Sequence, residues 1–145
     1  MDNVNEFIKL LNISEDEYVV LACSYGPDSM CLLDILIKNG INVIVAHVNH
    51  KLREESDKEY VDLEEYCHKN NIIFEGSIID KYPKGNIEAY GRSFRYNFFE
   101  SIVKKYKAKY LFTAHHGDDL IETILMRIAR GASLRGYAGF KKITK

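Results

Sequence analysis

A six-residue loop holds the first side chains suited to chemistry. It follows the apolar, β-branched run 18–23, which is typical of a buried parallel strand, and it leads into a helical pattern. The loop reads Ser24, Tyr25, Gly26, Pro27, Asp28, Ser29. Gly26 permits backbone conformations that a Cβ resists, and Pro27 suits the first position of a helix. Loop amides and the helix N-terminus would then point at one spot, which predicts an anion site.

The chemistry of this loop suits a phosphate chain. Ser24 and Ser29 add hydroxyl donors, and Asp28 is suited to holding Mg²⁺ on the phosphates. The loop is not a Walker A motif, because the GK[ST] signature is absent. An ordinary strand–turn–helix connection, in which Asp28 and Ser29 favour the first helical turn, explains the same residues equally well.

A second polar segment covers residues 46–56, at the end of another apolar run. His47 and His50 are metal ligands by type, but HxxH at a strand end is poor geometry for a shared metal ion. Ser56, with Glu59 three residues later, predicts a capping box at the start of a helix. From the residues alone, a polar loop with a helix cap is the favoured interpretation.

The third group lies on a long predicted helix at about 87–105. One apolar face follows helical spacing and comprises Ile87, Gly91, Phe94, Phe98 and Ile102. The neighbouring face comprises Glu88, Arg92, Arg95 and Phe99. A surface ion pair between Glu88 and Arg92 would be worth little. The alternative is that Arg95 reaches a phosphate, because a guanidinium can bind two oxygens at once.

The fourth group opens a helix predicted at about 117–129. If helical geometry begins near His115, then His115, Asp119 and Glu122 share one face at positions i, i+4 and i+7. Such a face also suits a metal ion, which is the main competing chemistry. Asp118 and Asp119 have a structural explanation as well, since acids stabilise a helix N-terminus.

Strands and helices alternate along the chain. The predicted strands are 18–23, 41–48, 72–76 and 110–114, and the predicted helices are 3–12, a segment ending at Asn39 before Gly40, 56–70, 87–105 and 117–129. This order predicts an α/β three-layer sandwich with a mostly parallel sheet and helices on both faces. Ligands of such sheets bind beyond the carboxyl ends of the strands, where three of the four groups lie.

Composition sets the class of protein. Hydrophobic residues make up 46% and charged residues 28% of the 145 residues, as in an ordinary soluble domain. No apolar run is long enough for a membrane span, and the N-terminus lacks a signal peptide, so we expect a cytoplasmic protein without a membrane partner. The three cysteines are widely spaced and without a CxxC pair, which predicts reduced thiols.

The charge is unevenly distributed. Residues 1–88 carry 8 Lys and Arg against 17 Asp and Glu, a net charge of −9, whereas residues 89–145 carry 12 against 4, a net charge of +8. Either acidic helices simply come first, or the second half faces a polyanion such as ATP or nucleic acid. Composition does not decide between these.

Taken together, the four groups resemble one family. The loop resembles the SGGxDS signature of PP-loop ATP pyrophosphatases, whose fold is adenine nucleotide alpha-hydrolase-like (Rossmann-like). The segments at 46–56, 88–99 and 113–123 are similar to the HVNHxLRxES, EAxARxxRYxFF and HHxDDQxET motifs of tRNA(Ile)-lysidine synthases. Two residues depart from the motifs. Tyr25 replaces the first glycine, which would strain the loop if that position needs a positive φ, and Leu120 replaces a glutamine.

The resemblance implies an activity and a set of roles. Such an enzyme uses ATP to adenylate the wobble cytidine of tRNA(Ile) and then attaches free L-lysine, releasing AMP and pyrophosphate. Residues 24–29 and Arg92 would bind ATP, with Mg²⁺ on Asp28, and Arg95 would stabilise charge near the α-phosphate. Asp119 and Glu122 would hold the lysine ammonium, with His115 beside them.

Two other functions remain open at this point. One is a nucleotide- or RNA-binding module without turnover, and the other is a tRNA thiolation enzyme of the same superfamily. We expect residues 1–145 to form one PP-loop domain that is truncated relative to the family and lacks its C-terminal tRNA-binding domains. The sequence leaves the oligomeric state open, a homodimer included.

Overall fold

The computed structural model describes residues 6, 8–117, 120–127 and 140–144, with side chains up to residue 113. Its strands are β1 (Tyr18–Ala22), β2 (Asn42–Asn49), β3 (Ile73–Ile78), β4 (Tyr110–Gly117), β5 (Leu120–Arg127) and β6 (Phe140–Thr144). Its helices are α2 (Pro27–Lys38), α3 (Ser56–Lys69) and α4 (Ile87–Tyr106). Residues 6 and 8–10 are also helical, within the predicted segment 3–12.

The strands form one sheet in the order β3-β2-β1-β4-β5-β6. The pairs β3–β2, β2–β1 and β1–β4 are parallel, whereas β4–β5 and β5–β6 are antiparallel. The chain therefore builds outward from β1 to β3 and then crosses through α4 to the other side of β1. This reversal between β1 and β4 is the point where open α/β sheets bind their ligands.

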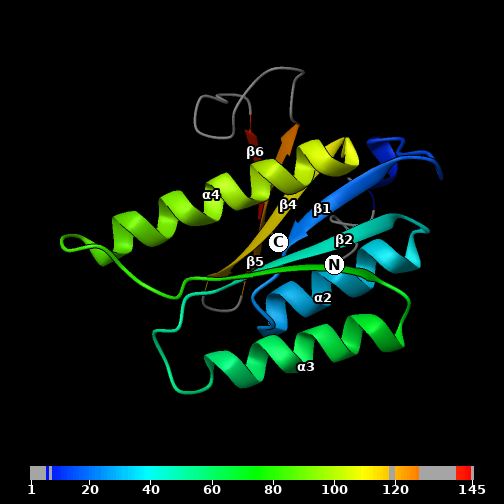
Figure 1. The fold of residues 1–145 in the computed structure, drawn as a ribbon. Helices are drawn as coiled ribbons and strands as arrows, with labels where there is room; N and C mark the ends of the chain where they lie inside the picture. Colours follow the sequence, from blue (N-terminus) through cyan, green and yellow to red (C-terminus); the bar gives the residue numbers. More distant parts are fainter. Residues whose placement is uncertain (1–5, 7, 118–119, 128–139, 145) are drawn as a thin grey trace.

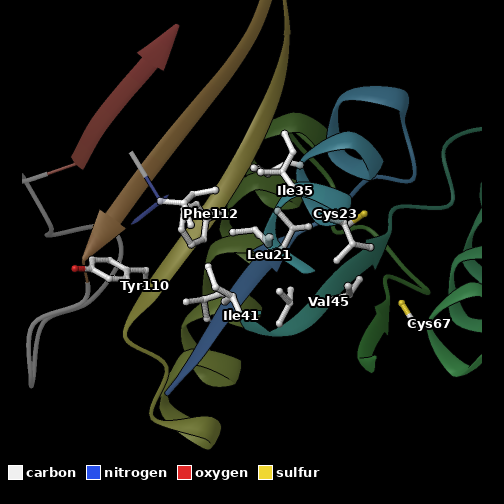
Figure 2. Close-up of a cluster of buried hydrophobic side chains, with 14 of the residues drawn as sticks. Leu21, Cys23, Ile35, Ile41, Val45, Cys67, Tyr110 and Phe112 are labelled. Carbon is white, nitrogen blue, oxygen red and sulfur yellow. The ribbon is translucent and has the colours of Figure 1, made fainter. Parts of the chain in front are cut away.

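Alternating side chains of the parallel strands feed two cores. Val19 and Leu21 point into the core on the side of α2 and α3, which also contains Phe112, and Figure 2 shows this cluster. Val20 and Ile44 point into the opposite core, under α4. Figure 1 shows α2 and α3 below the sheet and α4 above it. The predicted three-layer α/β sandwich is confirmed.

Two local predictions at helix ends have different outcomes. Gly40 follows α2 with a φ of +74°, so the predicted glycine stop is confirmed. The predicted capping box is wrong: Glu55 is the N-cap of α3, and no side chain caps it. The Glu59 carboxylate instead accepts a hydrogen bond from the Arg53 guanidinium at 2.6 Å, so it is engaged by a side chain and does not cap the helix.

The predicted last helix is also wrong. Leu120–Arg127 is strand β5, which runs antiparallel to β4 from Gly117↔Leu120 to Tyr110↔Arg127. The segment is short, apolar and contains Ile121, Thr123 and Ile124, and periodicity alone does not separate such a run from a helix. Strand β4 is correspondingly longer than predicted. Among the described residues, no helix is both long and apolar enough to cross a bilayer.

Candidate functional site

The loop after β1 is tied together by its own hydroxyl groups. Ser24 Oγ and Ser29 Oγ lie 3.2 Å apart, and the Ser24 amide donates to Ser29 Oγ at 3.4 Å. The Gly26 amide donates to Ser24 Oγ, also at 3.4 Å. Ser29 is 2% exposed, so its hydroxyl belongs to the floor of the loop. The two serines therefore set the path of the backbone before α2 begins.

The backbone conformation of the loop differs from the expectation for Gly26. Gly26 is extended, with φ −79° and ψ 167°, and Tyr25 is the residue with a left-handed φ of +65°. For a residue with a Cβ this conformation costs about 1–2 kcal/mol relative to right-handed backbone. Position 25 is where the family motif has a glycine, so its tyrosine is strained. The half-buried Tyr25 side chain packs against the core on the α2 side, which offsets part of this cost.

Helix α2 begins directly behind this loop. Pro27 occupies the first turn, as predicted, and Asp28 is the acid in that turn. The first amides of a helix have no partner within it and carry the positive end of its dipole. The loop therefore presents hydroxyls and amide hydrogens in one place, which is what an anion requires.

His47, on β2, ties the neighbouring strand end to this loop. Its ring is 7% exposed, and Nδ1 lies 2.7 Å from the Cys23 carbonyl oxygen. A carbonyl oxygen can only accept, so Nδ1 carries the proton and donates. Burial lowers the pKa of His47, although the Cys23 carbonyl and Glu59 oppose this effect. The His47 ring is therefore held neutral, and it contacts Cys23, the residue directly before the loop.

Asn49 organises the turn that follows β2. It is 2% exposed, and its side-chain Nδ2 donates to Asp57 Oδ1 at 2.8 Å. Its side-chain Oδ1 accepts a hydrogen bond from the backbone amide of Lys51 at 2.9 Å. Lys51 has a left-handed φ of +56° and reaches Asp57 through its ammonium group at 3.3 Å. These bonds fix the course of the chain from β2 to α3.

Helix α4 brings an arginine to the same place. His50 lies against α4 at Gly91, where an added Cβ would be only 3.2 Å from His50 Nδ1. Burial lowers the pKa of His50, with a further contribution from the positive charge of Arg95. The Arg95 guanidinium lies 5.8 Å from the centre of the Tyr96 ring. Close packing at Gly91 thus sets how near α4 and Arg95 come to the end of β2.

These elements enclose a cavity of about 490 Å³, which we call the central cavity. The loop after β1 contributes Ser24 and Ser29, and α4 contributes Arg95. The end of β2 and the segment after it contribute His47, Asn49, His50 and Arg53, and β4 contributes Thr113. The structure thus brings together three of the predicted site residues, Ser24, Ser29 and Arg95, at the carboxyl ends of the parallel strands.

The other predicted residues lie elsewhere. Tyr25, Gly26, Pro27 and Asp28 belong to the same loop but are not among the described residues that line the central cavity. Arg92 lines a second pocket of about 340 Å³, the side pocket, which is also lined by Arg95. Phe99, expected on the arginine face, is buried and lines the central cavity.

The last predicted group is only partly described. His115 pairs with Glu122 across the β4–β5 ladder, so their backbones are adjacent, although not on the predicted helix. Asp119 lies outside the described residues. Among the residues whose side chains are described, no group of three or more His, Cys, Asp or Glu is arranged to hold a metal ion.

Several cavity residues escaped sequence reasoning. Asn49, Arg53 and Glu59 line the central cavity, but they were not predicted as site residues. Asn49 and Arg53 lie within the same motif string as His47 and His50, which was a usable signal. Thr113 begins the motif-like segment 113–123, but its position in the cavity depends on how β4 pairs with β1.

The chain resembles known proteins over its whole length. Residues 1–145 match the family described as the PP-loop domain. The tRNA(Ile)-lysidine synthase of Lactiplantibacillus plantarum is 40% identical over 133 residues, which is 88% of this chain and 30% of that protein. The protein of the same name from Bacillus subtilis is 37% identical over 155 residues, 100% of this chain and 33% of that protein. The chain therefore spans about a third of the length of the curated relatives it matches.

Two solved structures share the fold at low identity. The U34-tRNA thiolase NcsA from Methanococcus maripaludis has a TM-score of 0.57 at 16% identity, over 67% of this chain and 37% of that one. The NH3-dependent NAD synthetase from Campylobacter jejuni has a TM-score of 0.54 at 15% identity, over 76% of this chain and 52% of that one. With a family match that covers all of its residues, the chain belongs to the PP-loop domain family.

Proposed function

We propose that this chain is the ATP-binding and adenylating part of an enzyme that joins lysine to the wobble cytidine of tRNA(Ile). The observation that carries the proposal is the central cavity, where Ser24 and Ser29 of the loop meet Arg95 of α4. The names of the relatives, which are tRNA(Ile)-lysidine synthases at 37–40% identity, support this choice of reaction.

ATP fits this site by size and charge. A cavity of about 490 Å³ is within the range of about 300–1,000 Å³ that holds small ligands. The polyphosphate would lie against the loop and the N-terminus of α2, where amides and the two serine hydroxyls donate. The apolar lining from Val48, Phe99 and Leu111 would surround the adenosine. Arg95 would then lie beside the α-phosphate and neutralise charge there.

The reaction has two steps. The O2 oxygen of cytidine attacks the α-phosphorus of ATP, and the bond to the bridging oxygen of pyrophosphate breaks. The Nε atom of lysine then attacks C2 of the base, the C2–O bond breaks and AMP leaves. Arg95 and the loop hold the reacting phosphates in line. Asp28, in the first turn of α2, would hold Mg²⁺, and the ion would supply positive charge to the pyrophosphate.

Lysine requires a carboxylate site. We assign its ammonium group to Asp119 and Glu122, with His115 adjacent, because β4 and β5 pair His115 with Glu122 at the end of the sheet that carries the loop. A cytoplasmic location is part of the proposal, because the proposed substrates are tRNA(Ile), ATP and free L-lysine. A homodimer stays a prediction.

Sulfur transfer is less well supported. Burial raises the pKa of the Cys23 thiol to about 11 and that of the Cys67 thiol to about 12. Neither thiol therefore forms a reactive thiolate readily near neutral pH. These two buried cysteines belong to the core on the α2 side.

A chimera tests the proposal. Residues 1–145 replace the aligned third of the Bacillus subtilis relative, and lysine incorporation into a tRNA(Ile) transcript is measured with radiolabelled lysine, together with AMP release. We expect incorporation that depends on ATP and on a wobble cytidine, and that is lost in Asp28→Ala. The 145-residue chain alone is expected to bind Mg-ATP weakly by calorimetry and not to modify tRNA.

Three outcomes would contradict the proposal. One is a chimera that folds and binds ATP but incorporates no lysine. Another is equal incorporation when the wobble cytidine is replaced by uridine. The third is lysidine formation by the isolated 145 residues, which would refute the expected division of labour within the enzyme.

A further inference from the structure

The side pocket adjoins the central cavity. It lies between the segment after β2 and the first turns of α4, and it shares His50, Leu52 and Arg95 with the central cavity. Because three side chains line both, a ligand in the side pocket would lie next to one bound at Arg95. Position alone therefore makes the side pocket a candidate for the second substrate of the reaction.

The lining combines exposed apolar groups with free positive charge. Leu52 is 59% exposed and Ile87 is 45% exposed, so both present apolar surface at this pocket. Among the ion pairs of the described residues, none includes Arg92 or Arg95. In particular, the Glu88–Arg92 pair suggested by helical spacing does not form there. Both guanidiniums are therefore available to an anion.

Gly91 allows the His50 ring to approach α4 closely. It is the buried residue of α4 between Ile87 and Arg95, and the His50 ring lies directly over it. The ring consequently forms part of the wall between the two pockets. The His50 carbonyl accepts a hydrogen bond from the Tyr82 hydroxyl at 2.6 Å, which fixes the backbone at this wall.

This lining matches the chemistry of a single-stranded nucleic acid. Apolar side chains can contact the face of a base, and unpaired guanidiniums bind backbone phosphates. Glu88, which also lines the pocket, can accept a hydrogen bond from the exocyclic amino group of an adenine or a cytosine. The carboxylates of an acidic peptide would also pair with the arginines, but they offer Glu88 no hydrogen-bond donor.

We infer that the side pocket holds the nucleotides of the RNA substrate next to the reacting base, and that Arg92 binds an RNA phosphate instead of ATP. This inference rests on the proposed function, because it takes the ligand of the central cavity to be ATP. RNA in the side pocket would reach the α-phosphate past Arg95 and His50, the residues that line both pockets.

Binding measurements on the 145-residue chain separate the two sites. The probes are Mg-ATP, measured by calorimetry, and a fluorescein-labelled RNA heptamer with a central cytidine, measured by anisotropy at several salt concentrations. We expect Arg92→Ala to weaken RNA binding about tenfold and to reduce the salt dependence by about 0.7 in slope, the contribution of one phosphate contact on a single strand. Its affinity for ATP should stay within twofold of the original chain.

Three further variants complete the design. Arg95→Ala should weaken both ligands, because Arg95 lines both pockets. Lys69→Ala, which removes one exposed charge at the end of α3, should affect neither. Arg92→Lys should recover the salt slope but not the full affinity, since it keeps the charge and loses the planar guanidinium. Circular dichroism confirms that each variant is folded.

The inference is overturned if Arg92→Ala leaves RNA affinity and salt slope unchanged, or if it weakens ATP as much as RNA. Equal loss of RNA binding in Lys69→Ala would also overturn it, because the RNA would then respond only to net charge. Failure of the proposed function has a different signature: no ATP binding by the original chain, whatever the RNA result.

Discussion

The hydrogen bond from His47 to the Cys23 carbonyl offers a sharp test of how the site is held. The bond is 2.7 Å long and its donor is 7% exposed. A neutral hydrogen bond contributes about 1 kcal/mol, and a buried carbonyl left without its donor costs about 1–3 kcal/mol. We therefore expect His47→Leu to lower the free energy of unfolding by about 2 kcal/mol at pH 7.5.

His47→Asn is the matched control. The asparagine amide can take the place of Nδ1–H as the donor to Cys23, so most of the stability should return. Urea unfolding followed by circular dichroism measures both variants. Because the bond fixes the residue before Ser24, His47→Leu should also weaken Mg-ATP binding more than His47→Asn does.

The pH dependence gives an independent reading. Burial places the pKa of folded His47 below its ordinary value of 6.5, so the unfolded chain takes up a proton first as the pH falls. Stability from His47 is thus present above about pH 6.5 and is lost below it, by at most about 1.4 kcal/mol at pH 5.5. His50 acts in the same direction. His47→Asn should remove one of the two contributions.

Two results would refute this reasoning. Equal stabilities of His47→Leu and His47→Asn at pH 7.5 would mean that the bond to Cys23 contributes nothing. An unchanged loss of stability between pH 7.5 and pH 5.5 in His47→Asn would mean that His47 is not held neutral by the fold.

Substitutions at three other positions test the local geometry. Tyr25→Ile should lower the melting temperature, because a β-branched residue is least tolerant of a φ of +65°, whereas Tyr25→Gly should not; equal melting temperatures would contradict a left-handed residue 25. Asn49→Ala should cost about 2 kcal/mol in urea unfolding, since it removes the donor to Asp57 and the acceptor of the Lys51 amide; a change under 0.5 kcal/mol would refute the role of this turn. Gly76→Val should displace the Tyr60 ring, whose phenol lies where a Cβ would be, and the tyrosine fluorescence should change; an unchanged spectrum and stability would refute this contact.

The sequence was sufficient for the parallel half of the sheet. Each of its strands is a short apolar run next to a clear helical pattern, so β1, β2, β3 and the start of β4 were predicted within a few residues. After Gly117 this contrast disappears. Leu120–Arg127 is compatible with either a helix or a strand, and its state depends on pairing with β4, which is a tertiary contact.

The site was predicted less completely than the fold. The loop and His47 lie at or near the carboxyl ends of parallel strands, so topology brings them together, whereas Arg95 lies in the middle of α4 and joins them because α4 packs on β1 and β2. That Arg95 lines both pockets, whereas Arg92 lines the side pocket and not the central cavity, was not predictable, because it depends on how α4 packs against His50 at Gly91. From the sequence, strain at Tyr25 was expected only if position 25 needs a positive φ. Whether it adopts one was not predictable, because backbone propensities disfavour a left-handed tyrosine.

The wall between the two pockets has a thermodynamic consequence. His50, Leu52 and Arg95 each face both volumes, so a ligand that reorients any of them alters the surface its neighbour meets. If ATP and RNA occupy the two pockets as proposed, linkage requires that the factor by which ATP changes the affinity for RNA equals the factor by which RNA changes the affinity for ATP. The coupling would pass through the wall that the His50 ring forms against Gly91 of α4.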